Sequence, residues 1–355
     1  MTKENTGDND MLHVTVCVVV YNAIQNIQQC IDSLIAQDYP SSHYEILFID
    51  NNSTDGTKQL LLYYDEHYKN IRTLINPIIG IAGSRNLGLM RAKHDFVAFT
   101  DSDCVPPQNW LSRLAFGFEN HLREDPELVA VGGSNIPPKN SGLLYDALSV
   151  FLNTYLGSHG SVQGKRFDRN RYVSHLPTVN VMYHKPTVMS IGGFDVTFGN
   201  IGEDQDLSYR LSKKGCRFIY IADAAVVHKL RPTLKSWLRN MFVYGKGRIW
   251  LMRKHTDKMQ LMLFAPLLLV LSMPLTILSI WNLIFLVPLF YFPLMLLASI
   301  IESIKVRQFH LALPLFFLFI GTHFAYGCGE IAGALKNRER FRLQEGSPLV
   351  IDTDK

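Results

Sequence analysis

Two aspartates separated by one residue follow an apolar run in the first third of the chain. Asp101 and Asp103 come directly after Phe96–Thr100, which predicts that a loop at a strand end holds both carboxylates near one point. Such crowding is unfavourable unless a cation neutralises it. Mg²⁺ and Mn²⁺ take oxygen ligands and bridge diphosphates, so the pair predicts a divalent metal site; a solvated acidic turn is the alternative.

Three further acids lie within four residues at the start of a helical pattern. Glu203, Asp204 and Asp206 repel one another there. They can simply complement the helix dipole, but a carboxylate in this position can also act as a general base toward a hydroxyl group. His228 follows the apolar stretch 218–227, which predicts another strand. A lone histidine is more often structural, unless it faces the same metal.

Two more polar groups, Tyr21-Asn22 and Asp50-Asn51, also follow predicted strands. Taken singly, Asp and Asn after a strand are usually turn formers. Like these two groups, the Asp101–Asp103 pair and the acids from Glu203 onward lie just past predicted strands. The shared order of the four groups favours one common site over four unrelated turns.

The segments that must position these groups alternate between strand and helix patterns. The predicted strands are 14–20, 45–50, 71–75 and 96–99, and the helical patterns are 24–35, 60–68 and 82–92. This alternation predicts an α/β fold with a mostly parallel sheet flanked by helices. Ligands bind beyond the carboxyl ends of such strands, which is where the polar groups fall.

The C-terminal third has a different composition. Residues 259–301 and 308–329 contain no Asp, Glu, Lys or Arg. At about 1.5 Å per helical residue these stretches are long enough to cross a bilayer core of roughly 30 Å, which predicts membrane segments at 261–281, 283–302 and 309–331, with a hairpin at Trp281-Asn282. The alternative is a buried hairpin of a soluble domain.

A basic segment precedes the apolar stretches. Lys229–Lys258 carries nine Lys and Arg residues against one acid, Asp257, interleaved with aromatic residues. This suits an anionic membrane surface, and the positive-inside rule places the preceding domain in the cytoplasm; an ordinary solvated basic face is the alternative. Three full crossings would export the basic tail, whose charges are Lys336, Arg338, Arg340 and Arg342. Either the third segment is re-entrant or interfacial, or the rule fails here.

Overall composition excludes several classes of protein. The net charge of +4 over 355 residues is too small to indicate nucleic-acid binding. Five cysteines without a CxxC pair indicate neither a disulfide framework nor a zinc site. The start of the chain shows no export signal.

Taken together, the motifs resemble those of family 2 glycosyltransferases of the GT-A fold, over roughly residues 12–255. The resemblance rests on VVVYNA (18–23), FIDNNSTDG (48–56), GSRNLGL (83–89), FTDSDCVP (99–106), GGFD (192–195), GEDQDLSYRL (202–211) and VVH (226–228). It implies that Asp101 and Asp103 form a DxD metal motif, that His228 is a further metal ligand, and that Asp204, beside Glu203, is the catalytic base. It also implies nucleotide-binding roles for Tyr21, Asn22, Asp50, Asn51, Arg85 and Asp101.

The implied activity is inverting transfer from a UDP- or GDP-sugar, with Mn²⁺ or Mg²⁺, to a lipid-linked saccharide. The second strand ends in Asp50-Asn51 where this family commonly has two aspartates, so the nucleobase stays open; Asn51 can still bond a base edge. The QxxRW signature of processive synthases is absent, which favours addition of one sugar at a time. The alternatives are a polyprenyl-phosphate sugar synthase and an inactive receptor for nucleotide sugars or lipid; a transporter is excluded because the polar groups lie outside the apolar segments.

The predicted organisation therefore has five parts. These are a disordered N-terminus (1–11), a GT-A catalytic domain (12–228), a membrane-interface segment (229–258), a transmembrane region (259–333) and a C-terminal tail (334–355). The expected location is the inner (plasma) membrane, with several membrane passes, bound membrane lipids and a cytoplasmic catalytic domain.

Overall fold

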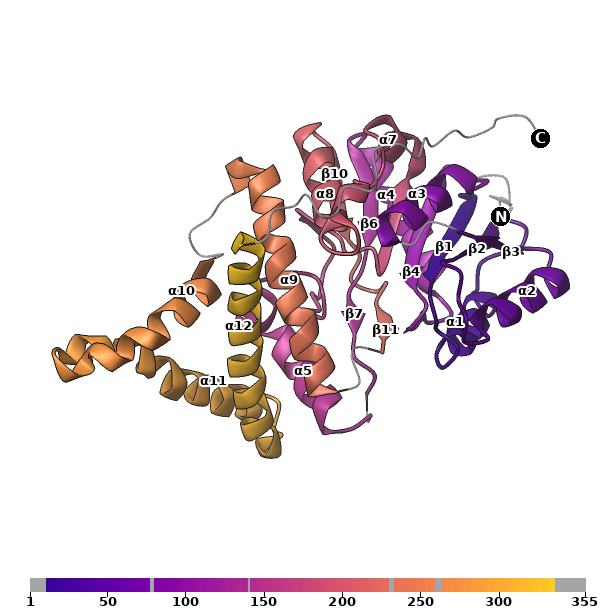
Figure 1. Ribbon diagram of the computed structural model, residues 1–355. Helices are drawn as coiled ribbons and strands as arrows, with labels where there is room; N and C mark the ends of the chain where they lie inside the picture. Colours follow the sequence, from indigo (N-terminus) through magenta and orange to yellow (C-terminus); the bar gives the residue numbers. More distant parts are fainter. Residues whose placement is uncertain (1–10, 77–79, 140, 230–232, 259–263, 336–355) are drawn as a thin grey trace, which may run out of the picture.

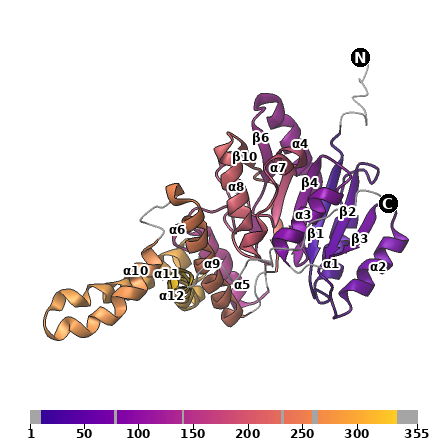
Figure 2. The same cartoon turned by 45° about the horizontal axis from the view of Figure 1, so that its top comes forward.

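The computed structural model describes residues 11–76, 80–139, 141–229, 233–258 and 264–335 (Figure 1). The predicted disorder of the N-terminus and the predicted basic tail fall almost entirely on residues 1–10 and 336–355, outside the described residues. The described chain forms a sheet domain followed by a group of long apolar helices, which lie beside it in both views (Figures 1 and 2).

The main sheet has eight strands in the order β3-β2-β1-β4-β9-β6-β10-β8. Its strands are β1 (Val14–Val20), β2 (Tyr44–Asp50), β3 (Ile71–Ile75), β4 (Phe96–Asp101), β6 (Leu128–Gly132), β8 (Arg171–Val173), β9 (Asn180–His184) and β10 (Arg217–Tyr220). The first four strands are mutually parallel, whereas β9 runs antiparallel between β4 and β6, and β8 antiparallel at the edge. The predicted α/β fold with a mostly parallel, helix-flanked sheet is confirmed.

Helices cover both faces of this sheet because its strands are apolar on both sides. One face of β1 packs with helices α1 (Ile27–Ile35), α2 (Thr57–His67) and α4 (Trp110–Glu124). The other face packs with α3 (Ile81–Arg91), α7 (Lys185–Ser190) and α8 (Glu203–Lys213). Alternate residues of β1 thus enter two separate cores, as expected for a strand buried on both faces.

A second, three-stranded sheet lies beyond the carboxyl edge of the first. It consists of β5 (Cys104–Val105), β11 (Val226–His228) and β7 (Asn135–Ile136) in that order. The predicted single strand over 218–227 is wrong: residues 217–220 join the main sheet as β10, and Val226–His228 pairs in the small sheet instead. The break at 221–225 carries His228 away from the main sheet toward the loop after β4.

The C-terminal helices form a packed group and a projecting hairpin. Helix α9 (Leu234–Lys254) packs along α12 (Ala312–Leu335), and α5 (Leu143–Asn153) and α6 (Tyr155–Ser158) lie against α12. Helices α10 (Ala265–Ser272), η4 (Met273–Ile280), η5 (Leu283–Phe290) and α11 (Tyr291–Lys305) form a hairpin that projects from the body (Figures 1 and 2). The chain turns at Trp281-Asn282, and Trp281 is 75% exposed.

Two of these apolar segments are long enough to cross a membrane within the described residues. They are Leu283–Lys305 and Phe309–Leu335, whereas Ala265–Ile280 is shorter. The first predicted segment, 261–281, begins in residues outside the described chain, so the number of crossings stays a prediction. The apolar side chains of the hairpin are largely exposed, whereas the apolar side chains of a soluble core are buried.

Candidate active site

The strand register aligns the predicted polar groups at one edge of the main sheet. Val20 of β1 pairs with Asp50 of β2, and Val19 pairs with Asp101 of β4. Asp50 and Asp101 therefore flank the end of β1, at the carboxyl edge where α/β sheets bind ligands.

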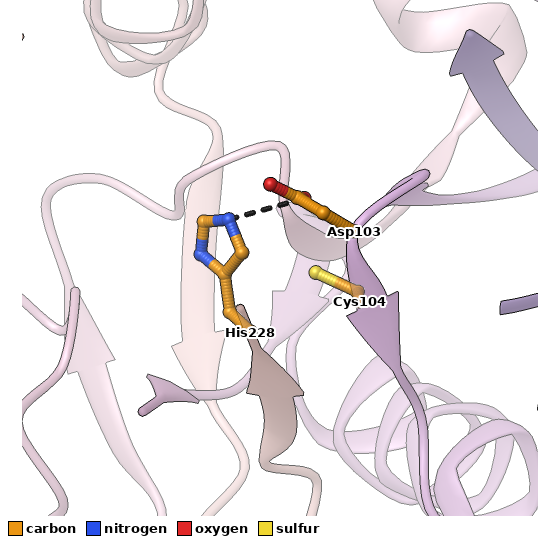
Figure 3. A group of neighbouring side chains, drawn as sticks. All are labelled: Asp103, Cys104 and His228. Carbon is orange, nitrogen blue, oxygen red and sulfur yellow. Dashed lines mark ion pairs between the residues drawn. The ribbon is translucent and has the colours of Figure 1, made fainter. Parts of the chain in front are cut away.

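The small sheet brings His228 to the loop after β4. His228 of β11 pairs with Cys104 of β5, and its Nε2 lies 3.2 Å from Oδ1 of Asp103 (Figure 3). Ligand atoms of Asp103, Cys104 and His228 all lie within 4.8 Å of one another. Residues 125 positions apart in the sequence, from 103 to 228, thus form one candidate metal site.

The chemistry of this group fits a hard divalent ion held by oxygen and nitrogen. Cys104 is fully buried, and burial, followed by the charges of Asp103 and Asp101, raises the pKa of its thiol well above the usual value. A neutral thiol is a poor ligand, whereas the Asp103 carboxylate and the His228 imidazole suit Mn²⁺ or Mg²⁺. The Nδ1 atom of His228 is 3.0 Å from Nδ2 of Asn135, a contact that orients the ring.

Asp101 belongs to the same group of charges. Its pKa is raised, first by burial and then by Asp103, and the nearby Arg85 opposes this rise. The Arg85 guanidinium lies 3.6 Å from the Asp101 carboxylate. A cation beside Asp101 and Asp103 would relieve their mutual repulsion.

The three acids at the start of α8 occupy three different environments, and Glu203 is the most enclosed. It forms a buried ion pair with Arg85, which comes from α3. Burial raises the pKa of Glu203 to about 7, against the effect of Arg85. Arg85 therefore bridges the loop after β4 and the start of α8, and one oxygen of Glu203 is occupied by this bridge.

Asp204 faces a cavity instead. Gly202, whose φ of +81° is in the left-handed region that glycine favours, turns the chain into α8 just before it. One oxygen of Asp204 accepts a hydrogen bond from the Gln205 backbone at 2.8 Å, and the other is 3.7 Å from Nε2 of His175. Burial lowers the pKa of His175, so a neutral imidazole faces the Asp204 carboxylate and does not cancel its charge at neutral pH.

Asp206 is fully buried and has a structural role. It accepts hydrogen bonds from Arg210 Nε at 2.7 Å and from Lys254, and it lies 2.8 Å from Nε2 of His255. Lys254 and His255 belong to the end of α9, so this cluster fastens the helix that carries Asp204 to the helix that leads toward the apolar segments.

Replacing Asp206 by asparagine is expected to lower the free energy of unfolding by about 3–5 kcal/mol, because the partly buried Arg210 and Lys254 would lose their fully buried carboxylate partner. Thermal unfolding of the detergent-solubilised protein measures the change. Asp223→Asn is the control, since the Asp223 side chain is 74% exposed and lies 3.9 Å from Arg113. Equal unfolding temperatures for the two variants would contradict the structural role.

A cavity of about 300 Å³ joins these groups. Asp101, Asp204 and His228 line one part of it, and residues of α9 and α12 line another. His228 of the candidate metal site and the Asp204 carboxylate thus face a single space, which also reaches the apolar helices.

Several predicted nucleotide-binding residues lie at the neighbouring strand ends, outside the residues that line this cavity, and already have partners. Asp50 accepts hydrogen bonds from the backbone and hydroxyl of Ser53, and Asn51 accepts bonds from Ser84 and Asn76. Asn22, with φ of +47°, accepts a bond from the Thr54 backbone. These contacts shape the loops after β1 and β2 and leave Tyr21 55% exposed.

Sequence reasoning missed Asn135, because only a tertiary contact brings it to His228. His175 and Arg248 line the cavity as well. Asn180 is fully buried and bonds Trp110 and the carbonyls of Ser134 and Ala224, although its neighbours Thr178 and Val179 do line the cavity.

The fold and site together define a glycosyltransferase of the GT-A type. Among solved structures, a mannosyltransferase from Pyrobaculum calidifontis, in complex with GDP-Man and Mn2+, superposes with a TM-score of 0.59 over 92% of this chain and 88% of its own, at 17% identity. S. aureus TarS 1-349, in complex with UDP-GlcNAc, gives a TM-score of 0.51 over 90% of this chain and 91% of its own, at 16% identity. At such identities the likeness concerns the fold alone.

Sequence comparison gives the family. The model described as "Glycosyl transferase family 2" matches residues 15–149, and that of "Glycosyl transferase family group 2" matches residues 96–323. Glycosyltransferase AglE of Haloferax volcanii is 31% identical over 237 residues, which are 66% of this chain and 73% of AglE. The chain therefore belongs to glycosyltransferase family 2.

A second relative extends through the C-terminal region. A dolichyl N-acetyl-alpha-D-glucosaminyl phosphate 3-beta-D-2,3-diacetamido-2,3-dideoxy-beta-D-glucuronosyltransferase of Methanococcus voltae is 25% identical over 337 residues. The match covers 94% of this chain and all of that protein. The likeness therefore includes the apolar helices as well as the sheet domain.

Proposed function

We propose that the protein transfers single sugars, with inversion, from a nucleotide diphosphate sugar to a hydroxyl group of a lipid-linked saccharide. The observation that carries this proposal is the cavity that contains Asp204, reaches His228 and Asp101, and continues to the apolar helices. The name of the Methanococcus relative, which includes a dolichyl phosphate, supports a lipid-linked acceptor. The neighbouring structures with GDP-Man and UDP-GlcNAc support a nucleotide sugar as donor.

Asp204 would act as the base. One of its oxygens is fixed by the Gln205 backbone, and the other faces the cavity beside a neutral His175. In this position Asp204 removes the proton of the acceptor hydroxyl as that oxygen attacks the anomeric carbon. The attack occurs on the face opposite the departing diphosphate, so the configuration at that carbon inverts. The bond from the anomeric carbon to the diphosphate oxygen breaks in the same step.

Asp103 and His228, with Asp101 beside them, would hold a Mn²⁺ or Mg²⁺ ion. When bound, this ion offsets the charge that develops on the leaving diphosphate. Arg85 holds Glu203 and Asp101 in their relative positions, so Glu203 supports the site without moving a proton. Tyr21, Asn22, Asp50 and Asn51 would surround the base and ribose at the adjoining strand ends.

The apolar helices would hold the enzyme at a membrane. The exposed hairpin around Trp281 and the basic α9 supply lipid-facing surface and positive charge, and residues of α9, α10 and α12 line the cavity. This arrangement favours a catalytic domain of residues 12–228 on the cytoplasmic face, an interface segment at 229–258 and membrane segments within 259–333.

A transfer assay tests the proposal. Full-length protein in membranes is incubated with Mn²⁺ and a panel of radiolabelled UDP- and GDP-sugars, and lipid-linked saccharides and bare polyprenyl phosphate are offered separately. We expect label on the saccharide, with the anomeric configuration opposite to that of the donor. Label on bare polyprenyl phosphate alone would instead establish a polyprenyl-phosphate sugar synthase, whose acceptor needs no proton removed.

A further inference from the structure

The cavity continues past Asp204 into a chamber between the interface helix and the last apolar helix. There α9 contributes Tyr244 and Arg248, and α12 contributes Thr322, His323 and Tyr326. Pro266 of α10 lines the cavity as well. A ligand in this chamber can therefore reach both the reaction centre and the apolar helices.

Arg248 is the cation of this chamber. Its Nε donates a hydrogen bond to the Tyr326 hydroxyl at 3.0 Å. Among the described residues, no carboxylate forms a close ion pair with it; Asp204 and the fully buried Glu330 act on it only at longer range. A guanidinium has five donors, and a partly buried one without a close anion is costly unless a ligand supplies the charge.

Apart from the more distant carboxylates of Asp204 and the buried Glu330, two histidines and several hydroxyl groups line the cavity near Arg248. His159, which also lines the cavity, has a lowered pKa because of burial and then because of His323 and Arg248. A neutral imidazole at His159 can donate to a phosphate oxygen or accept from a hydroxyl group, whereas both ring nitrogens of His323 already contact Tyr291 and the Leu156 carbonyl. The chamber is therefore suited to an anion with a polar continuation toward Asp204.

The packing of α9 on α12 fixes this geometry. A Cβ atom added to Gly245 would overlap the Tyr326 carbonyl, and one added to Gly329 would overlap the Phe242 carbonyl. The two helices thus approach closely at Tyr326 and in the turns of α9 that precede Arg248. The bond to Tyr326 uses one of the five N–H donors of Arg248, so its other donors can bind a ligand.

We propose that Arg248 binds the phosphate of the acceptor's lipid carrier, with Tyr326 as its positioning residue. The saccharide then extends toward Asp204, and the hydrocarbon chain leaves past Pro266 and Thr322 along the apolar helices. This assignment rests on the proposed function, since it takes the acceptor to be lipid-linked, and it adds the group that recognises it.

Binding of farnesyl phosphate to the full-length protein in neutral detergent tests this assignment, with farnesol and inorganic phosphate as comparison ligands. We expect farnesyl phosphate to bind roughly 10- to 100-fold more tightly than farnesol, and Arg248→Gln to abolish this preference. Tyr326→Phe should reduce it by a smaller factor, because the charge remains. Arg239→Ala, which removes an exposed arginine of the same helix, is the matched control and should keep the full preference.

Three results would overturn the assignment. The first is equal binding of farnesyl phosphate and farnesol by the wild-type protein, and the second is an undiminished preference for farnesyl phosphate in Arg248→Gln. The third is displacement of farnesyl phosphate by an equal concentration of inorganic phosphate, which would mean a site for free phosphate. Binding of UDP or GDP with Mn²⁺ is measured on every variant to verify folding. If the wild-type protein transfers no sugar but still prefers farnesyl phosphate, and Arg248→Gln loses this preference, the phosphate site is supported and the proposed function is rejected.

Discussion

Replacing Asp204 by asparagine is expected to lower kcat by about 10²- to 10⁴-fold, the usual contribution of a positioned general base. Asparagine keeps the size of the side chain and the bond from the Gln205 backbone, but it cannot take a proton. Because the role proposed for Asp204 concerns the acceptor hydroxyl, the affinity for the donor nucleotide should stay unchanged. Single-turnover transfer and nucleotide titration on the same preparation separate the two effects.

Glu203→Gln is the informative comparison for this prediction. Glu203 is adjacent in the sequence but is paired with Arg85 inside the protein, so its replacement should reduce thermal stability together with activity. Asp204→Asn should leave thermal stability intact. Normal turnover in Asp204→Asn would remove it from the mechanism, whatever the behaviour of Glu203→Gln.

Loss of the divalent ion should have an equally large effect. Chelation by EDTA is expected to abolish transfer, and Mn²⁺ or Mg²⁺ should restore it. Asp103→Ala should lower kcat/KM by roughly 10²-fold or more, because an ion that stabilises a leaving diphosphate contributes several kcal/mol. The measurement is the Mn²⁺ dependence of kcat/KM, together with Mn²⁺ binding followed by electron paramagnetic resonance.

Cys104→Ala provides the control for the metal site. Cys104 lies with Asp103 and His228 in the same group, but its thiol is buried and neutral. Mn²⁺ affinity should therefore survive in Cys104→Ala and fall in His228→Ala. The opposite order would show that sulfur holds the ion and that the oxygen and nitrogen assignment is wrong.

Local sequence predicted the first half of the sheet because each strand there is a continuous apolar run. Residues 14–20 form β1 with the predicted bounds, and 71–75 form β3. The antiparallel insertion of β9 was not predicted, since an apolar run carries no sign of its direction. The separation of Val226–His228 from β10 was missed for a related reason: its partners, Cys104–Val105 and Asn135–Ile136, are each too short to be recognised alone.

The acids of α8 show that the partner of a charged side chain cannot be predicted from local sequence. The pattern of Glu203, Asp204 and Asp206 indicates charge that needs compensation, but not where each partner is. Arg85 lies 118 residues before Glu203, and Lys254 lies 48 residues after Asp206. Only the tertiary fold separates these acids into an internal ion pair, a cavity-facing carboxylate and an anchor for α9.

Anomalous X-ray scattering from crystals with Mn²⁺ and UDP or GDP tests most directly whether distant residues converge on one ion beside the reacting base. The account predicts a single manganese peak within about 2.0–2.3 Å of Asp103 Oδ and His228 Nε2, touching the nucleotide diphosphate and on the cavity shared with Asp204. A bound nucleotide with manganese remote from Asp103 and His228, or with Asp204 turned away from the sugar, would contradict it.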